Sequence, residues 1–67
     1  MRLIKLKEVM ECTALSRASI YRLMAQDDFP KSVSLGERSV AWVESEVHEW
    51  VLVRIGMRDS EMSNTHV

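Results

Sequence analysis

The 67-residue sequence predicts a single, mainly α-helical domain with three helices and a small β-hairpin. Three observations lead to this prediction. Two short segments with helical spacing of apolar residues precede the proline, two runs of alternating apolar residues follow it, and a third helical segment comes after them. The core must be small, because a domain of this length buries only about 60% of its unfolded surface. We assign the domain to residues 1–56 and expect residues 57–67, which show no periodicity, to form a flexible tail.

The N-terminal part of the chain predicts an extended segment and then a short helix. Met1 to Leu6 has two partly apolar faces, which suits either a short edge strand or an extended arm. Residues 7–13 follow as a short helix, with Val9 and Met10 at apolar positions. We expect Cys12 to be a small buried residue of this helix, since a free cysteine commonly behaves as a small apolar side chain.

Residues 16–26 are the most informative part of the chain. A turn from Thr13 to Leu15 leads into them, and Ser16 can cap a helix because its hydroxyl accepts from free N–H groups of the first turn. One side of this second helix is an apolar stripe of Ile20, Leu23 and Met24. The opposite arc holds Ala18, Ser19, Arg22 and Gln26, with Arg17 and Tyr21 on its flanks, and these are small, hydrogen-bonding and basic residues.

A short helix, a tight turn and a capped second helix are the parts of a helix-turn-helix motif. The arc is suited to a DNA major groove, because small residues allow close approach while cations and amides meet phosphates and base edges. Taken alone, the segment fits an ordinary amphipathic surface helix equally well.

Residues 31–42 predict a β-hairpin. The second helix is expected to end around Gln26-Asp27-Asp28, and Phe29-Pro30 stops it there, because the residue before a proline is disfavoured in the α region. Alternating apolar residues then stand on either side of Gly36-Glu37-Arg38-Ser39, which we interpret as a four-residue connection. A hairpin at this place is a wing, so the predicted fold is a winged helix-turn-helix. Its tip offers Arg38 and Ser39 to a phosphate or a minor groove, and a purely structural hairpin is the plainer interpretation.

The third helix is predicted from Glu44 to about Gly56, with glutamates in its N-terminal half where the helix dipole favours them. Its core stripe is Val43, Val47, Trp50, Val51 and Ile55. Leu52 and Val53 point away from this stripe, so the helix is apolar over much of its circumference. These two residues either form a partner surface, such as a dimer interface, or pack against the N-terminal arm.

The charge is unevenly distributed along the chain. Residues 1–42 contain seven basic and five acidic residues, for a net charge of +2, whereas residues 43–67 contain two and five, for −3. A phosphate senses the local potential within a Debye length of about 8 Å, so a total of −1 does not exclude nucleic acid. We expect weak binding that depends strongly on salt.

Other classes of function find little support in the sequence. Cys12, with His48 and His66 far from it and from each other, does not have the spacing of a zinc site. We see no nucleophile–base pair and no glycine-rich phosphate loop, and therefore expect no enzyme activity, no cofactor and no small-molecule ligand. No apolar run is long enough to span a bilayer, so we expect a cytoplasmic protein without membrane contact.

Four segments together form a family pattern. They are Arg2-Leu-Ile-Lys-Leu6; Thr13-Ala-Leu-Ser-Arg-Ala-Ser-Ile-Tyr-Arg22; Phe29-Pro-Lys31 leading to Val33-Ser-Leu-Gly36; and Val40-Ala-Trp42 followed by Glu44-Ser-Glu-Val47 and Glu49-Trp50. Over residues 2 to about 53 the chain resembles the AlpA family of prophage and mobile-element regulators, which are related to MerR-like winged-helix proteins and phage excisionases.

The resemblance implies a regulator that binds double-stranded DNA, with the second helix on the DNA and the hairpin as the wing. Carried over to this chain, the helix contacts are Arg17, Ser19, Tyr21 and Arg22, and the wing contacts are Lys31, Arg38 and Ser39. We add Ser16 and Ala18 from the same helix; Ala18 stands where many relatives carry a larger polar residue.

The expected function is sequence-specific DNA binding by a transcriptional regulator or an excisionase-like factor. One small module covers only about 600–1,000 Å² of DNA, so we expect a homodimer or cooperative copies on DNA. A protein-interaction module that uses the apolar third helix is the alternative.

Overall fold

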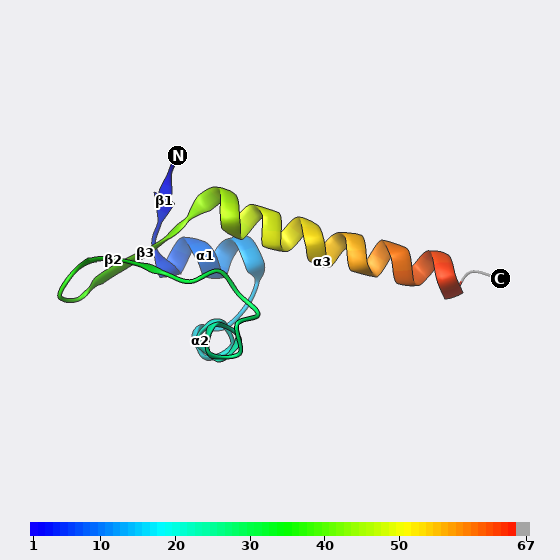
Figure 1. Ribbon diagram of the computed structural model, residues 1–67, viewed down its shortest axis with the longest axis horizontal. Helices are drawn as coiled ribbons and strands as arrows, with labels where there is room; N and C mark the ends of the chain where they lie inside the picture. Colours follow the sequence, from blue (N-terminus) through cyan, green and yellow to red (C-terminus); the bar gives the residue numbers. More distant parts are fainter. Residues whose placement is uncertain (66–67) are drawn as a thin grey trace.

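The structure is a computed structural model and describes residues 1–65. Its elements in chain order are β1 (Leu3–Ile4), α1 (Leu6–Thr13), α2 (Arg17–Ala25), β2 (Val33–Gly36), β3 (Ser39–Val43) and α3 (Glu44–Thr65). The predicted fold class is confirmed: three helices and a small antiparallel hairpin form a mainly helical winged helix-turn-helix (Figure 1).

The helix-turn-helix is built by caps at both sides of its turn. Ala14 ends α1 in the left-handed conformation, with φ 60°, and its N–H donates to the Met10 carbonyl (2.8 Å). Ser16 then caps α2 as predicted, because its hydroxyl accepts from the Ser19 N–H (3.1 Å). Leu15 lies between the two caps and packs against the core. The turn between the two helices is therefore held by these two hydrogen bonds and by the packing of Leu15.

Replacing Ala14 by glycine is expected to stabilise the protein by about 0.5 kcal/mol. The left-handed conformation costs an L-residue about 1–2 kcal/mol, and glycine avoids this cost. Glycine also makes the unfolded chain more flexible, which lowers the stability by about 0.4–1 kcal/mol, so a small net gain remains. Urea denaturation followed by circular dichroism measures the difference. Ala18→Gly, at an exposed site inside α2, is the control and is expected to destabilise. If Ala14→Gly also lowered the midpoint, residue 14 would not hold this conformation in solution.

The N-terminal segment is a strand and not a free arm. β1 pairs antiparallel with β3, with Leu3 opposite Val43 and Ile4 opposite Trp42, so the sheet order is β1-β3-β2. The pairing continues where the Glu44 N–H donates to the Arg2 carbonyl (2.8 Å). The central strand β3 ends at Val43 and α3 begins at Glu44, with no residue between them.

The hairpin connection is shorter than predicted. Gly36 pairs with Ser39, so only Glu37 and Arg38 form the turn, and the expected four-residue connection is wrong. The register shifts between Ser34 and Gly36, which places a bulge at Leu35. This bulge lets the strands pair up to the turn, which the alternation of apolar residues alone did not indicate.

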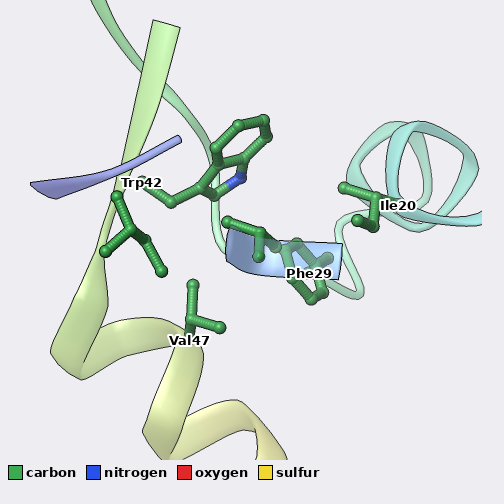
Figure 2. Close-up of a cluster of buried hydrophobic side chains, with 6 residues drawn as sticks. Ile20, Phe29, Trp42 and Val47 are labelled. Atoms are coloured by element: carbon green, nitrogen blue, oxygen red, sulfur yellow. The ribbon is translucent and has the colours of Figure 1, made fainter. Parts of the chain in front are cut away.

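The core takes one or more side chains from nearly every element. Its buried residues are Ile4, Val9, Ile20, Phe29, Trp42 and Val47. Figure 2 shows Ile20 from α2, Phe29 from the following loop, Val47 from α3 and the Trp42 indole converging on one region. The expectation of a buried Cys12 is wrong, since Cys12 is exposed. Thr13 takes the inward position at the end of α1, where its hydroxyl donates to the Val9 carbonyl (2.8 Å).

Helix α3 is longer than predicted and leaves the core. It continues through Gly56 to Thr65, so the expected end near Gly56 is wrong. Val47 is fully buried, but Ile55 is 41% exposed. The expectation that Ile55 belongs to the core stripe is therefore wrong. In Figure 1 the second half of α3 projects away from the other elements, along a long axis of 53 Å. The division into a domain (1–56) and a tail (57–67) stays a prediction, and residues 66 and 67 lie outside the described residues.

Within the described part of the chain, the helices fall short of the length and apolar character that crossing a membrane requires.

Candidate nucleic-acid interface

The outer face of α2 presents the predicted groove-facing residues to solvent. Arg17, Ala18, Tyr21 and Arg22 are exposed, and Ser19 is half-buried. Figure 1 looks along the axis of α2, which lies at the opposite side of the molecule from α3. No acidic residue occurs between Ser16 and Gln26. This face is therefore positively charged, and Ala18 gives it a small side chain.

The two serines of this helix already have partners within the chain. Ser16 receives the Ser19 N–H, and the two hydroxyl oxygens lie 2.9 Å apart. Their first role is thus to start α2, as a serine cap does. Their predicted contact with DNA stays a prediction.

Tyr21 is held between an arginine and the core. The Arg17 guanidinium lies 5.9 Å from the centre of the Tyr21 ring, and that ring meets Trp42 edge to face at 6.4 Å. Trp42 is itself fixed, because its Nε1–H donates to the Pro30 carbonyl (3.1 Å). Trp42 therefore couples the outer face of α2 to strand β3, a role that sequence reasoning missed because it needs the position of both elements.

The hairpin tip carries one of the predicted wing cations. Arg38 is exposed in the two-residue turn beside Glu37. Ser39 is half-buried, and its hydroxyl accepts from the Lys5 ammonium (2.6 Å). Lys5 was not among the predicted site residues. The β1–β3 pairing brings it to the base of the wing, and the alternating N-terminal segment was the only signal for that strand.

Lys31 lies at the end of α2 and not in the hairpin turn. Its ammonium donates to the Met24 carbonyl and pairs with Asp27 (2.9 Å). Asp27 is left-handed, with φ 59°, and the Asp28 N–H donates to the Leu23 carbonyl (2.8 Å). Together these contacts close the C-terminal end of α2, where a cation also suits the helix dipole. A DNA contact of Lys31 stays a prediction.

The two candidate interface residues of α3 are both exposed but face different surroundings. Leu52 is 65% exposed and lines a groove with Cys12, His48 and Val51, between α1 and α3. Val53 is 54% exposed and lines a second groove, which runs past Phe29 and Trp50 at the end of α2. The structure therefore does not join them into one patch. Their part in a dimer stays a prediction.

Among the described residues, no group of three or more histidine, cysteine or acidic side chains is placed to hold a metal ion.

The comparisons with known proteins agree with this architecture. Residues 2–55 match the family described as "Prophage CP4-57 regulatory protein (AlpA)". An uncharacterized protein, ORF88, of enterobacteria phage P4 is 46% identical over 57 residues, which cover 85% of this chain and 65% of the phage protein. The chain thus spans slightly less than two thirds of that relative.

A second relative has a functional description. The DNA-binding transcriptional activator AlpA of Escherichia coli strain K12 is 36% identical over 59 residues, which cover 79% of this chain and 84% of that protein. The family match includes both helices of the helix-turn-helix, the hairpin and the first half of α3. The chain belongs to the AlpA family of prophage regulatory proteins.

Proposed function

We propose that this protein is a sequence-specific regulator that binds double-stranded DNA, with α2 in the major groove and the β2–β3 hairpin as a wing. The observation that carries the proposal is the outer face of α2, which presents Arg17, Tyr21 and Arg22 around the small Ala18 and contains no acid. A relative that is 36% identical is named a DNA-binding transcriptional activator, which supports the same function. The regulated event is transcription or prophage excision.

Each residue of this face has a separate proposed role. Ala18 lets the α2 backbone approach the floor of the groove. Arg22 reads a base, because a guanidinium can donate twice to guanine, a contact worth about 1–3 kcal/mol of discrimination. Arg17 and Tyr21 hold phosphates and set the register of the helix. The contact of Tyr21 with the buried Trp42 gives that register a rigid support.

The wing is proposed to add phosphate contacts that do not depend on base sequence. Arg38 at its tip and Lys5 at its base are both exposed cations. Acidic residues close to these elements are partly neutralised within the chain. Arg2 pairs with Glu44 (2.6 Å) and Glu8 (3.0 Å), and Lys31 pairs with Asp27. These pairs neutralise cations as well as acids, so the attraction of this side of the molecule for phosphate rests on the excess of +2 in residues 1–42, which the net charge of −1 conceals.

The proposal is tested by the affinity of the protein for duplex DNA at several salt concentrations. We expect Arg38→Ala to weaken binding to all duplexes alike and to lower the slope of log K against log salt by about 1, since one phosphate contact is lost. Fluorescence anisotropy with labelled duplexes measures both quantities. Arg58→Ala, which removes the same charge from α3, is the matched control and should leave the slope unchanged. A parent protein that fails to retain duplex DNA even at low salt would rule out the proposed function.

A protein-interaction module is the second candidate, and one observation favours it. Leu52, Val53, Ile55 and Met57 are all between 41% and 65% exposed on α3. Exposed apolar residues gathered on one element mark interaction surfaces. Failure of DNA binding together with self-association would make this the main function.

A further inference from the structure

Four exposed residues form one seam along α3: His48, Leu52, Ile55 and Asp59. Their spacings of four, three and four residues are those of the a and d positions in a heptad repeat, so they share one face of the helix. Leu52 and Ile55 form its apolar centre, and they are 65% and 41% exposed. His48 and Asp59 form its two polar ends. Two heptads with an apolar centre are the pattern of a helix that packs against another helix.

The surroundings of the seam show that the chain itself does not cover it. From Leu52 to Ser60 every residue of α3 is exposed, on all sides of the helix. A helical segment without tertiary contacts is marginal in water, so packing against a partner would stabilise it. At the domain end, the seam continues into the groove that Cys12, His48, Val51 and Leu52 line between α1 and α3. A second helix laid on the seam would enter this groove and contact both elements.

We propose that the occupant of this seam is a second copy of the same chain, with the two α3 helices antiparallel. In that arrangement Leu52 of one copy packs on Ile55 of the other, and His48 lies beside Asp59 of the other copy. A parallel pair would instead place Asp59 against Asp59, and like charges in contact repel. The antiparallel order therefore buries the apolar centre and gives each polar end a hydrogen-bonding partner.

The charges along α3 favour the same direction. Its first part carries three glutamates, Glu44, Glu46 and Glu49, whereas its exposed part from residue 52 to residue 60 carries Arg54 and Arg58 against Asp59, for a net charge of +1. An antiparallel pair brings the acidic part of one helix toward the basic part of the other, and it also opposes the two helix dipoles. Arg58 and Asp59 are paired within one chain (2.7 Å), but both are largely exposed, and such pairs contribute little. Breaking the pair between Arg58 and Asp59 therefore costs little and does not prevent dimer formation.

The dimer goes beyond the proposed DNA binding and is tested without DNA. We expect sedimentation equilibrium to show a reversible monomer–dimer equilibrium for the parent chain. Leu52→Glu should raise the dissociation constant by more than about tenfold, because it puts a carboxylate into the apolar centre of the seam. Val53→Glu is the matched control: it changes the neighbouring residue, of similar exposure, on the side of the other groove, and should leave the constant unchanged.

Two outcomes of the sedimentation experiment would overturn the proposed dimer. Circular dichroism of each variant checks that it is folded, which we expect for changes at exposed sites. A parent chain that stays monomeric up to millimolar concentration overturns the proposal. So does a dimer that Val53→Glu weakens as strongly as Leu52→Glu, because the contact would then not follow the seam.

The orientation is tested by disulfide trapping in a Cys12→Ser background, which removes the one native thiol. One copy carries His48→Cys, the other carries Asp59→Cys, and an affinity tag makes their masses differ. Under mild oxidation of the mixture, we expect disulfides between the two different copies to predominate, since positions 48 and 59 face each other. Predominant bonds between identical copies would overturn the antiparallel arrangement in favour of a parallel one.

Discussion

Replacing Trp42 by alanine is expected to leave most of the protein unfolded at room temperature. The side chain is fully buried, meets Tyr21 edge to face, and donates its Nε1–H to the Pro30 carbonyl. Truncating a buried tryptophan costs about 3–5 kcal/mol. A chain of 67 residues has a total stability of roughly 3–10 kcal/mol at the usual range per residue. The loss is therefore comparable to the whole free energy of folding.

Far-UV circular dichroism in increasing urea measures this effect for the variant and the parent. Trp42→Phe is the graded control: it keeps an apolar ring in the core but leaves the Pro30 carbonyl without its donor, which costs about 1–3 kcal/mol. We expect the order parent, Trp42→Phe, Trp42→Ala in falling stability. An alanine variant with the midpoint of the parent would mean that Trp42 is not the centre of the core.

Replacing Arg22 by alanine is expected to abolish the preference for one base in the recognised site. In the proposed complex, Arg22 makes a bidentate contact with guanine, so its loss should reduce discrimination at that position by roughly 5- to 150-fold, or about 1–3 kcal/mol. The measurement begins with selection of preferred duplexes from a random pool by the parent protein. Dissociation constants are then compared for the selected duplex and its single-base variants.

Arg22→Lys is the informative control for this experiment. Lysine keeps the positive charge but lacks the planar fork, so it should keep the salt dependence of binding and lose most of the base preference. Arg58→Ala, on α3, should change neither. If Arg22→Ala discriminates among the duplexes as the parent does, another residue reads the base and the proposed docking of α2 is wrong.

The elements that were predicted correctly are those with local causes. The cap at Ser16, the apolar stripe through Ile20 and the end of α2 near Gln26 all depend on residues that are close to them in the chain. The hairpin was predicted for the same reason, because apolar residues at alternate positions indicate a strand whatever strand it pairs with. Its turn length was not found, because the bulge at Leu35 depends on the register between two strands.

The features that were missed depend on contacts between distant segments. Lys5 reaches Ser39 only because β1 pairs with β3, and an isolated six-residue segment gives no sign of its partner. Cys12 and Thr13 compete for one inward position, which the placement of α1 in the core decides. The end of α3 was misplaced because Gly56 suggested a helix terminus, although glycine inside a helix costs only about 1 kcal/mol.

The direct junction between β3 and α3 has a consequence for the DNA that a dimer would recognise. Since no linker residue separates Val43 from Glu44, the hairpin, the core around Trp42 and the start of α3 move as one rigid body. Two copies joined through α3 would then hold their α2 helices at one fixed separation and one fixed relative rotation. An operator for such a pair would contain inverted half-sites at a single spacing, and inserting or deleting a few base pairs between them would abolish joint binding.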